Sequence, residues 1–348
     1  MTTPSPVAAP ALSLVGASPP PLPGARGPLT ALVLARLRGE VPRAVATDGH
    51  HDADDLALAL YCSYELHYRG FAGVDPELEW DTELLALRRR LEARFLADVA
   101  DAVGPRTTVA PADVEATLAA LAADDGGPSL SGFLATEGTV EQMREFCVHR
   151  SAYQLKEADP HTWCVPRLSG SAKAAMVEIL TDEYGDGRTE AMHSELFAAT
   201  LGALGLDPQY GAYLDHLPGV TLAPINLMSL FGLHRRWRGA LVGHLALFEM
   251  TSVGPMSRYS AALERFGLPP AARRFYDVHV DMDVHHQRVA LEEMVRGFVA
   301  AEPERADDVV FGAMALTALE ARFSAHLLES WAGGRSSLRL PSAALSST

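Results

Sequence analysis

The segment DEYGDGRTEAMHSELF carries three side chains that bind transition metals: Glu183, Glu190 and His193. On an unbroken helix, which turns about 100° per residue, they lie within about 80° of one another. Gly185 and Gly187 stand between the first two, and a glycine inside a helix costs about 1 kcal/mol relative to alanine. Such a cost is tolerated where helices pack closely or where a helix bends. Both interpretations of the glycines stay open.

A second segment, FYDVHVDMDVHHQ, places His279, Asp283 and His286 at positions i, i+4 and i+7. These side chains form a stripe about 60° wide on a helix. His285 lies about 120° from His279 and is left out of the stripe.

Stripes of carboxylates and imidazoles on separate helices are the way a helical bundle builds a metal site in its core. The Glu-x-x-His spacing of residues 190–193 also occurs in di-iron bundles. Mixed oxygen and nitrogen ligands suit iron or manganese better than calcium or structural zinc. A single stripe is more often a solvated polar face, so the hypothesis depends on the pair.

Helical periodicity runs through nearly the whole chain after residue 30 and predicts an all-α protein. The expected helical segments cover residues 52–71, 81–103, 111–123, 139–159, 171–205, 224–233, 234–252, 269–300 and 305–334. Each stripe therefore lies on a long helix. DDGGPSLSG, residues 124–132, is the clearest break. The chain divides into a disordered Pro/Ala-rich tail (1–30), an N-terminal helical extension (31–130), a core (131–335) and a flexible tail (336–348).

The composition argues against several classes of partner. A net charge of −15 disfavours nucleic acid and anionic membranes. No basic residue precedes Arg26, and no apolar run approaches the roughly 20 residues of a membrane span, so a cytoplasmic location is expected. Cys62, Cys147 and Cys164 form no CxxC pair and are expected to be buried or idle thiols.

The chain resembles the iron-containing redox enzymes, also called heme-oxygenase-like diiron oxidases and oxygenases. The resemblance rests on HRSAYQLKEADPHTW, DEYGDGRTEAMHSELF and HVDMDVHH, and it covers roughly residues 135–335. It implies a helical bundle like that of heme oxygenase, without heme. It also implies a set of ligands to two Fe(II) ions, of which Glu157 is suggested by the resemblance alone: Glu157, Glu183, Glu190, His193, His279, Asp283 and His286.

The implied chemistry is activation of O₂, as co-substrate, through a peroxo-bridged diferric species that oxidises a small organic substrate. Outcomes in the family include N-oxygenation of amines, desaturation, and oxidative C–C cleavage of amino or fatty acids. Manganese is the other metal that suits these ligands. An external reductant and a homodimer involving residues 31–130 are further expectations. In the family the helix with the Glu-x-x-His ligands is often mobile and orders as metal binds, which favours a hinge at Gly185 and Gly187.

Some residues keep two interpretations. Glu249, in the apolar stretch LALFEMTS, contacts either the substrate or a metal-bound water, or else pairs with an arginine. An arginine cluster could grip a substrate carboxylate or pair with surface acids: Arg235, Arg236 and Arg238. Three residues adjoin the first ligand and are candidates for a pocket: Lys156, His161 and Trp163.

Three alternatives to a diiron oxygenase remain. The first is an iron-free enzyme of the heme-oxygenase fold, such as a thiaminase-like hydrolase. The second is a non-catalytic iron-binding protein. The third is a helical interaction protein with accidental stripes.

Overall fold

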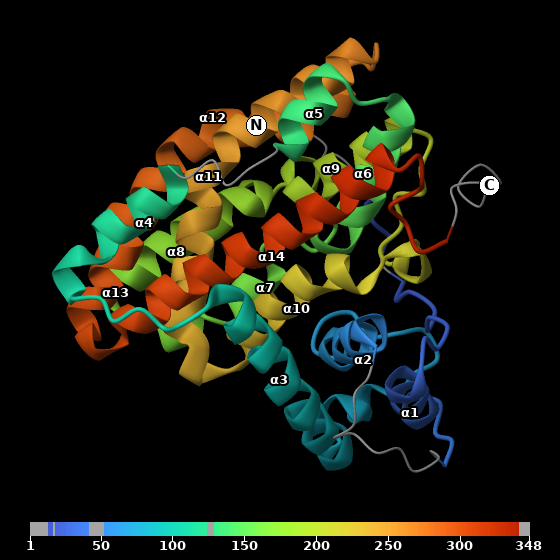
Figure 1. Ribbon diagram of the computed structural model, residues 1–348, viewed down its shortest axis with the longest axis horizontal. Helices are drawn as coiled ribbons and strands as arrows, with labels where there is room; N and C mark the ends of the chain where they lie inside the picture. The colour runs from blue at the N-terminus through green and yellow to red at the C-terminus, as the bar shows by residue number, and fades with distance from the viewer. Residues whose placement is uncertain (1–12, 17, 42–51, 124–128, 341–348) are drawn as a thin grey trace, which may run out of the picture.

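The computed structural model describes residues 13–16, 18–41, 52–123 and 129–340 (Figure 1). These residues form helices joined by turns and contain no strand, which confirms the all-α prediction. The helices are α1 (Pro28–Leu37), α2 (Ala53–Glu65), α3 (Thr82–Val103), α4 (Val114–Ala123), α5 (Leu130–Thr136), α6 (Val140–Gln154), α7 (Asp159–Thr162), α8 (Gly170–Glu183), α9 (His193–Ala203), α10 (Gly219–Leu233), α11 (Arg238–Arg265), α12 (Pro270–Arg288), α13 (Arg296–Ala301) and α14 (Ala306–Ala332). No helix in this part of the chain is both long and apolar enough to span a membrane.

The centre of the bundle is the packing of α11 against α12 and α14. Two glycines allow α11 and α14 to touch through their backbones. A Cβ atom on Gly243 would lie 1.8 Å from the carbonyl oxygen of Val309, and one on Gly312 would lie 1.9 Å from that of Ala240. Since no side chain fits at those distances, glycine is required at both positions.

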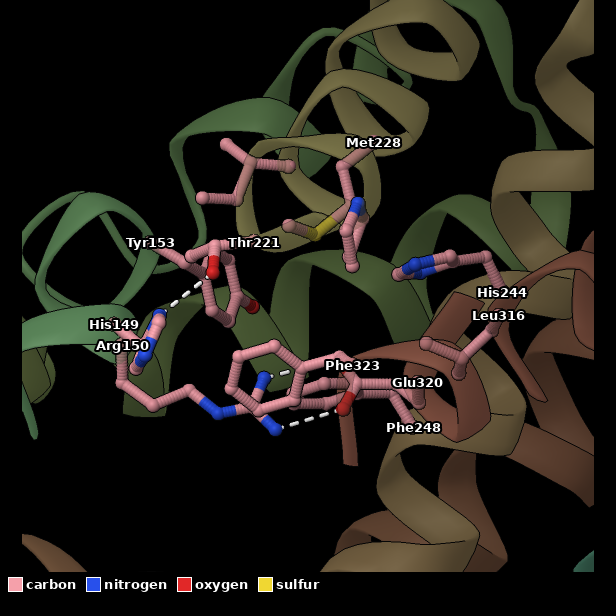
Figure 2. Close-up of a pocket in the computed structure, with 12 residues that line it drawn as sticks. His149, Arg150, Tyr153, Thr221, Met228, His244, Phe248, Leu316, Glu320 and Phe323 are labelled. Atoms are coloured by element: carbon pink, nitrogen blue, oxygen red, sulfur yellow. Dashed lines mark hydrogen bonds and ion pairs between the residues drawn. The ribbon is translucent and has the colours of Figure 1, made fainter. Parts of the chain in front are cut away.

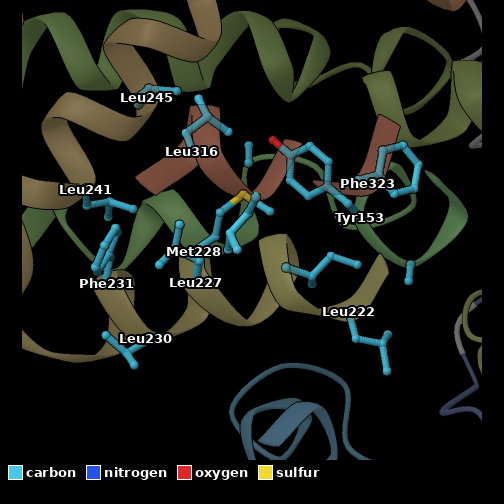
Figure 3. Packing of buried hydrophobic residues seen from close by; sticks show 14 of the residues in the cluster. Tyr153, Leu222, Leu227, Met228, Leu230, Phe231, Leu241, Leu245, Leu316 and Phe323 are labelled. Carbon is cyan, nitrogen blue, oxygen red and sulfur yellow. The ribbon is translucent and has the colours of Figure 1, made fainter. Parts of the chain in front are cut away.

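Figure 3 shows how α10 completes the apolar core. Met228 of α10 points toward Leu316 of α14, and Phe231 of α10 lies beside Leu241 of α11. All of these side chains are buried. Burial of a large apolar side chain contributes about 1.5–3 kcal/mol, so this layer fixes the helices that surround it.

The N-terminal helices α1 and α2 pack on the bundle through α10. The buried carboxylate of Asp55 accepts hydrogen bonds from the backbone N–H groups of Leu29 and Thr30 at 2.8 Å each, and so caps the start of α1. Asn226 of α10 donates to the carbonyl oxygen of Ala57 in α2. Helices α3 and α4 lie against α14. The predicted extension is therefore continuous with the bundle surface.

The expected tails differ from the structure where it describes them. Residues 13–16 and 18–27 run along the body, where the N–H of Tyr210 donates to Val15 and that of Gly24 to Asp215. At the other end, the N–H of Ser337 donates to Glu145, and Leu338 is buried. Polar side chains of the body hold both segments, which composition alone does not reveal. Residues 1–12 and 341–348 lie outside the described residues, as does most of the predicted break at 124–132.

The expected division of 224–252 after Leu233 is confirmed, since α10 ends there and the short 3₁₀ turn Arg235–Trp237 leads into α11. Another expected helix differs. The stretch 269–300 begins as α12, widens into a π-helix at Val289–Val295 and ends as α13. A π-helical segment of this kind is frequent next to functional sites, and here it directly follows the histidine-rich part of α12.

Candidate metal centre

Helices α8, α9, α11 and α12 converge with the end of α6 around a cluster of acids and histidines. Glu183 is the last residue of α8, and His193 is the first of α9. Seven side chains form this cluster, and all of them are buried: Glu157, Glu183, His193, Glu249, His279, Asp283 and His286. Buried ionisable groups in this number require compensation by each other or by a bound cation.

The first half of the cluster combines Glu157, Glu183, His193 and His279. Each offers one donor atom, and these atoms lie within 4.8 Å of one another. Oε2 of Glu183 is 2.8 Å from Nδ1 of His193, and Oε1 of Glu157 is 3.8 Å from Nε2 of His279. Nδ1 of His279 lies 2.7 Å from the carbonyl oxygen of Phe275, to which it donates. That bond leaves the lone pair of Nε2 directed at the cluster.

The second half combines Glu183, Glu249 and His286, again with donor atoms within 4.8 Å of one another. Nδ1 of His286 is 3.5 Å from Oε2 of Glu249 and 3.4 Å from Oδ1 of Asp283. On its other side, Nε2 of His286 lies 2.8 Å from Oδ2 of Asp182. A carboxylate behind a histidine is how proteins fix the orientation of a metal-binding imidazole. Glu183 belongs to both halves.

Several donor atoms at the centre have no hydrogen-bond partner among the described residues. These atoms are Oε2 of Glu157, Oε2 of Glu183, Nδ1 of His193, Oδ1 of Asp283 and Nδ1 of His286. An unsatisfied buried polar atom costs about 1–3 kcal/mol, so a site that gathers five of them is built for a ligand. Carboxylate oxygens and imidazole nitrogens are the donor set of iron or manganese. The residues therefore fit a transition-metal pair.

The electrostatics lead to the same conclusion. Burial and the neighbouring acids raise the pKa of Glu157 well above its ordinary value. Burial also raises the pKa of Glu249 to about 8. Burial alone would raise the pKa of Glu183 too, but the charge of His193 outweighs it and lowers that pKa to about 2. Buried carboxylates this close cannot all ionise unless cations lie among them.

The predicted helix over 171–205 is wrong, because it breaks between Glu183 and His193. Gly185, Asp186 and Gly187 have φ values of 61°, 54° and 77°, so three successive residues adopt the left-handed region. Glycine reaches that region without strain. Two short 3₁₀ turns, Gly185–Gly187 and Thr189–Ala191, then lead into α9. The glycines thus form a bend between candidate ligands, and the hinge interpretation gains support.

Glu190 is the sequence-predicted ligand that the structure leaves out of the cluster. Its placement on the same face as Glu183 assumed an unbroken helix. In the structure it lies exposed on the second 3₁₀ turn. The break nevertheless brings His193 against Glu183.

Three residues of the site were missed or left undecided by sequence reasoning. Glu249 joins the cluster, and its signal was a carboxyl group in an apolar helical stretch. Asp182, behind His286, gave no signal, because its contact depends on how α8 meets α12. Ser252, whose hydroxyl donates to Asp283 at 2.5 Å, is an ordinary helix residue in sequence.

The other candidates have different surroundings. Lys156 points away from the cluster and pairs with buried Glu65 at 2.9 Å. His161 lines a cavity beside the cluster. Trp163 packs against the ring of His67. In the arginine cluster, Arg238 pairs with Glu302, and Arg236 lies over the ring of Trp237.

The cysteines bear on the iron-free alternative. Cys62, Cys147 and Cys164 are buried and free, as expected. Burial raises the pKa of Cys147 and of Cys164 to about 12, so neither thiol forms a thiolate at neutral pH. They are poor nucleophiles for a hydrolase.

Comparison with known proteins agrees with the geometry. The sequence profile of the iron-containing redox enzymes matches residues 144–321, about half of the chain. A nitrosourea synthase of Streptomyces achromogenes subsp. streptozoticus is 27% identical over 147 residues, which is 42% of this chain and 31% of that protein. The similarity thus spans about a third of the relative's length. The matched region contains every member of the cluster. The chain belongs to the iron-containing redox enzyme family and has its all-α, heme-oxygenase-like fold.

Proposed function

We propose that this protein is a non-heme diiron oxidase or oxygenase that uses O₂ to oxidise a small organic substrate. The observation that carries the proposal is the position of Glu183, whose carboxylate belongs to two groups of donor atoms at once. A carboxylate shared between two groups of ligands is the arrangement that holds two metal ions side by side in a helical bundle.

The residues divide between two ions in this proposal. Glu157, Glu183, His193 and His279 would hold the first, and Glu183, Glu249, Asp283 and His286 the second. Two ferrous ions held here would supply the electrons that reduce O₂. The protein's own contribution is to fix the ligands and keep the surroundings dry.

Three groups behind the ligands fix their orientation. The carbonyl oxygen of Phe275 holds the ring of His279. Asp182 holds His286, and the hydroxyl of Ser252 holds one oxygen of Asp283. Partners of this kind raise metal affinity by about 10–100-fold. Ile179, Leu180, Leu245 and Phe248 line the cavity beside the cluster and limit the access of water.

Glu190 stays a candidate ligand in the proposal. It lies seven residues after Glu183, as the family resemblance implies, on a segment whose residues bond mainly to one another. The N–H of Arg188 donates to Gly185, and that of Ala191 donates to Arg188. Rearrangement of this segment about its glycines would be needed to bring Glu190 inward. Buried Glu249 and exposed Glu190 are therefore rival ligands for the second ion.

Iron binding and O₂ consumption, measured separately, test the proposal. The full-length protein is loaded with Fe(II) under nitrogen, and bound iron is counted per chain. O₂ uptake is then followed with a panel of amines, amino acids and fatty acids. We expect two irons per chain and uptake that depends on one class of compound, both lost in a His193→Ala, His286→Ala double variant.

Other outcomes identify the alternatives. Iron oxidation that no organic compound accelerates indicates an iron-binding protein without catalysis. A well-folded protein that binds no iron indicates an iron-free enzyme of this fold or an interaction protein.

A further inference from the structure

Two small cavities adjoin one another beside the metal cluster. The first, of about 10 Å³, is lined by cluster residues together with His161. The second, of about 20 Å³, is lined by His244, by apolar side chains of α10 and α14, and by two bonded polar pairs, His149 with Thr221 and Arg150 with Glu320. Tyr153 and Phe248 lie in the walls of both cavities. In this conformation each has room for about one water molecule.

His161 and His244 stand where the two cavities meet. Their ring centroids are 5.6 Å apart, and each residue is 1% exposed. Figure 2 shows the ring of His244 directed from its helix into the second cavity, toward Met228. The histidines thus lie between the metal cluster and the second cavity.

These imidazoles lack partners in the part of the chain that the structure describes. Nε2 of His161 and both ring nitrogens of His244 are buried without a hydrogen bond. Nearly all buried polar groups in proteins are satisfied, so an exception calls for a ligand or an ordered water. In the wall of the second cavity, His149 is already bonded to Thr221 and Arg150 to Glu320. The remaining wall residues of α10 and α14 are apolar.

The charged side chains near the two cavities restrict the chemical class of the ligand that the histidines bind. Arg150 lines the second cavity, and its guanidinium forms a bidentate ion pair with the carboxylate of Glu320, with N–O distances of 2.9 and 2.7 Å. Lys156 lines neither cavity, and its ammonium is bound to Glu65. A carboxylate would therefore find no free cation in the walls of the second cavity. Burial and the nearby His161 lower the pKa of His244 well below its ordinary value, so its ring offers one donor and one acceptor.

We propose that His161 and His244 bind the head group of the organic substrate, and that this head both donates and accepts hydrogen bonds. The matching class is a small apolar molecule that ends in an amide, an alcohol or an unprotonated amine, and not in a carboxylate. This inference rests on the proposed function, because it takes the cluster beside His161 as the place of oxidation. The second cavity accepts the apolar part of a larger substrate if Met228, a flexible side chain, moves aside.

Four-carbon probes with the same body test the head group. Butyramide, 1-butanol and butyrate are titrated into the full-length protein, both metal-free and loaded with Fe(II) under nitrogen, and binding is followed by ligand-observed NMR. We expect saturable binding of butyramide or 1-butanol, and at least about tenfold weaker binding of butyrate. Whichever of butyramide and 1-butanol binds more tightly identifies the preferred head group of the substrate. Tighter binding of butyrate, or no binding by any probe, overturns the inference.

Variants of His244 show whether the site is the one described. His244→Leu should weaken binding of the preferred probe about tenfold, because it removes a hydrogen bond. It should also raise Tm by about 2–4 °C, since it removes unsatisfied buried nitrogens. A histidine with a purely structural role would give a lower Tm instead. His244→Gln keeps a donor and an acceptor, and should keep most of the binding even if the leucine variant folds poorly.

His234→Leu is the matched control. His234 bonds to Glu92 and lines neither cavity, so its replacement should leave binding unchanged. If His244→Leu binds the probes as the wild type does, the inference is wrong. The experiments distinguish a failure of the head-group inference from a failure of the proposed diiron function. Probe binding that needs His244 in a protein that takes up no iron would contradict only the diiron function. Iron-dependent O₂ uptake with a preference for butyrate would contradict only the head-group assignment.

Discussion

Oε2 of Glu183 and Nδ1 of His193 lie 2.8 Å apart across a broken helix, at ion-pair distance, but the two groups are not aligned as in a well-formed hydrogen bond. Their separation is short enough for a bond, so it is the orientation of the groups that departs from one. Atoms that both point at a common third position behave in this way. That position is where a metal ion would find an oxygen and a nitrogen together.

The first prediction concerns the shared carboxylate. Glu183→Gln should reduce binding of both irons, because Glu183 belongs to both groups of donor atoms. Glu157→Gln should reduce binding of one, since Glu157 belongs to the first group alone. The measurement is iron per chain after anaerobic loading and desalting. Glu178→Gln, an exposed position on the same helix, is the control and should bind iron like the wild type.

Loss of only one iron in Glu183→Gln would contradict a shared ligand. Near-ultraviolet circular dichroism of each variant should match the wild type, which separates loss of a ligand from loss of the fold.

The second prediction concerns the carboxylate behind His286. Asp182→Asn should weaken binding of the second iron by about 10–100-fold and leave the first nearly unchanged, because Asp182 contacts His286 only on the side away from the cluster. The pair His285–Glu178 offers a matched comparison: it joins the same two helices at the same 2.8 Å but is exposed. Glu178→Gln should have no effect. A titration with Fe(II) that resolves two sites checks the difference.

Much of the site could be predicted where the local structure is regular. His279, Asp283 and His286 share one face because α12 is unbroken through all three. The same logic does not describe the position of Glu190, since it assumed helical geometry across Gly185 and Gly187, where the chain bends. The sequence shows that the two glycines would destabilise a continuous helix, but it does not show in which direction the chain bends at them.

The remainder depends on contacts between helices. Glu249 faces His286 because α11 and α12 pack in one particular register. Asp182 contacts His286 because α8 packs beside α12 in another. A single sequence carries no record of that register. Glu157 follows α6 in a turn, where no periodicity exists, and only resemblance to a family pointed to it. The all-α class was predictable because helical periodicity persists through each long segment.

The third prediction separates the rival ligands of the second iron. If buried Glu249 is the ligand, Glu249→Gln should lose one iron and Glu190→Gln should retain both. If the segment 184–192 refolds to bring Glu190 inward, Glu190→Gln should lose one iron, because glutamine is a weaker ligand than a carboxylate. Iron per chain decides between them. Asp186→Asn, exposed on the preceding 3₁₀ turn, serves as the control.

The fourth prediction concerns the bend itself. A Cβ on Gly185 would lie 2.4 Å from the carbonyl carbon of Ala191, whereas one on Gly187 would meet nothing within 4 Å. Gly187→Ala should therefore cost about 1–2 kcal/mol, the strain of a left-handed residue. Gly185→Ala should cost more, because a clash is added to the strain. Urea unfolding measures both.

Iron affinity of the same two variants tests the hinge. If both bind iron and consume O₂ like the wild type, the bend has no role in forming the site.

The last prediction is a dependence of stability on pH. Burial lowers the pKa of His149 to about 3, and its ring nitrogens bond to the hydroxyls of Thr221 at 2.6 Å and Ser337 at 3.0 Å. His326 and Arg150 further oppose a positive charge on the ring, while Glu145 favours one. In the unfolded chain the same histidine has a pKa near 6.5. Between these values the unfolded state binds a proton that the folded state does not.

Stability therefore falls as the pH drops from about 6.5 toward 3, by up to about 1.4 kcal/mol per pH unit from this residue. His149→Gln keeps the neutral hydrogen-bonding character and removes the titration. Carboxylates also titrate in this range, so the measured quantity is the difference between wild type and variant. Urea unfolding at pH 7, 6, 5 and 4 should show the wild type losing stability faster. Parallel curves for the two proteins would mean that His149 accepts a proton in the fold.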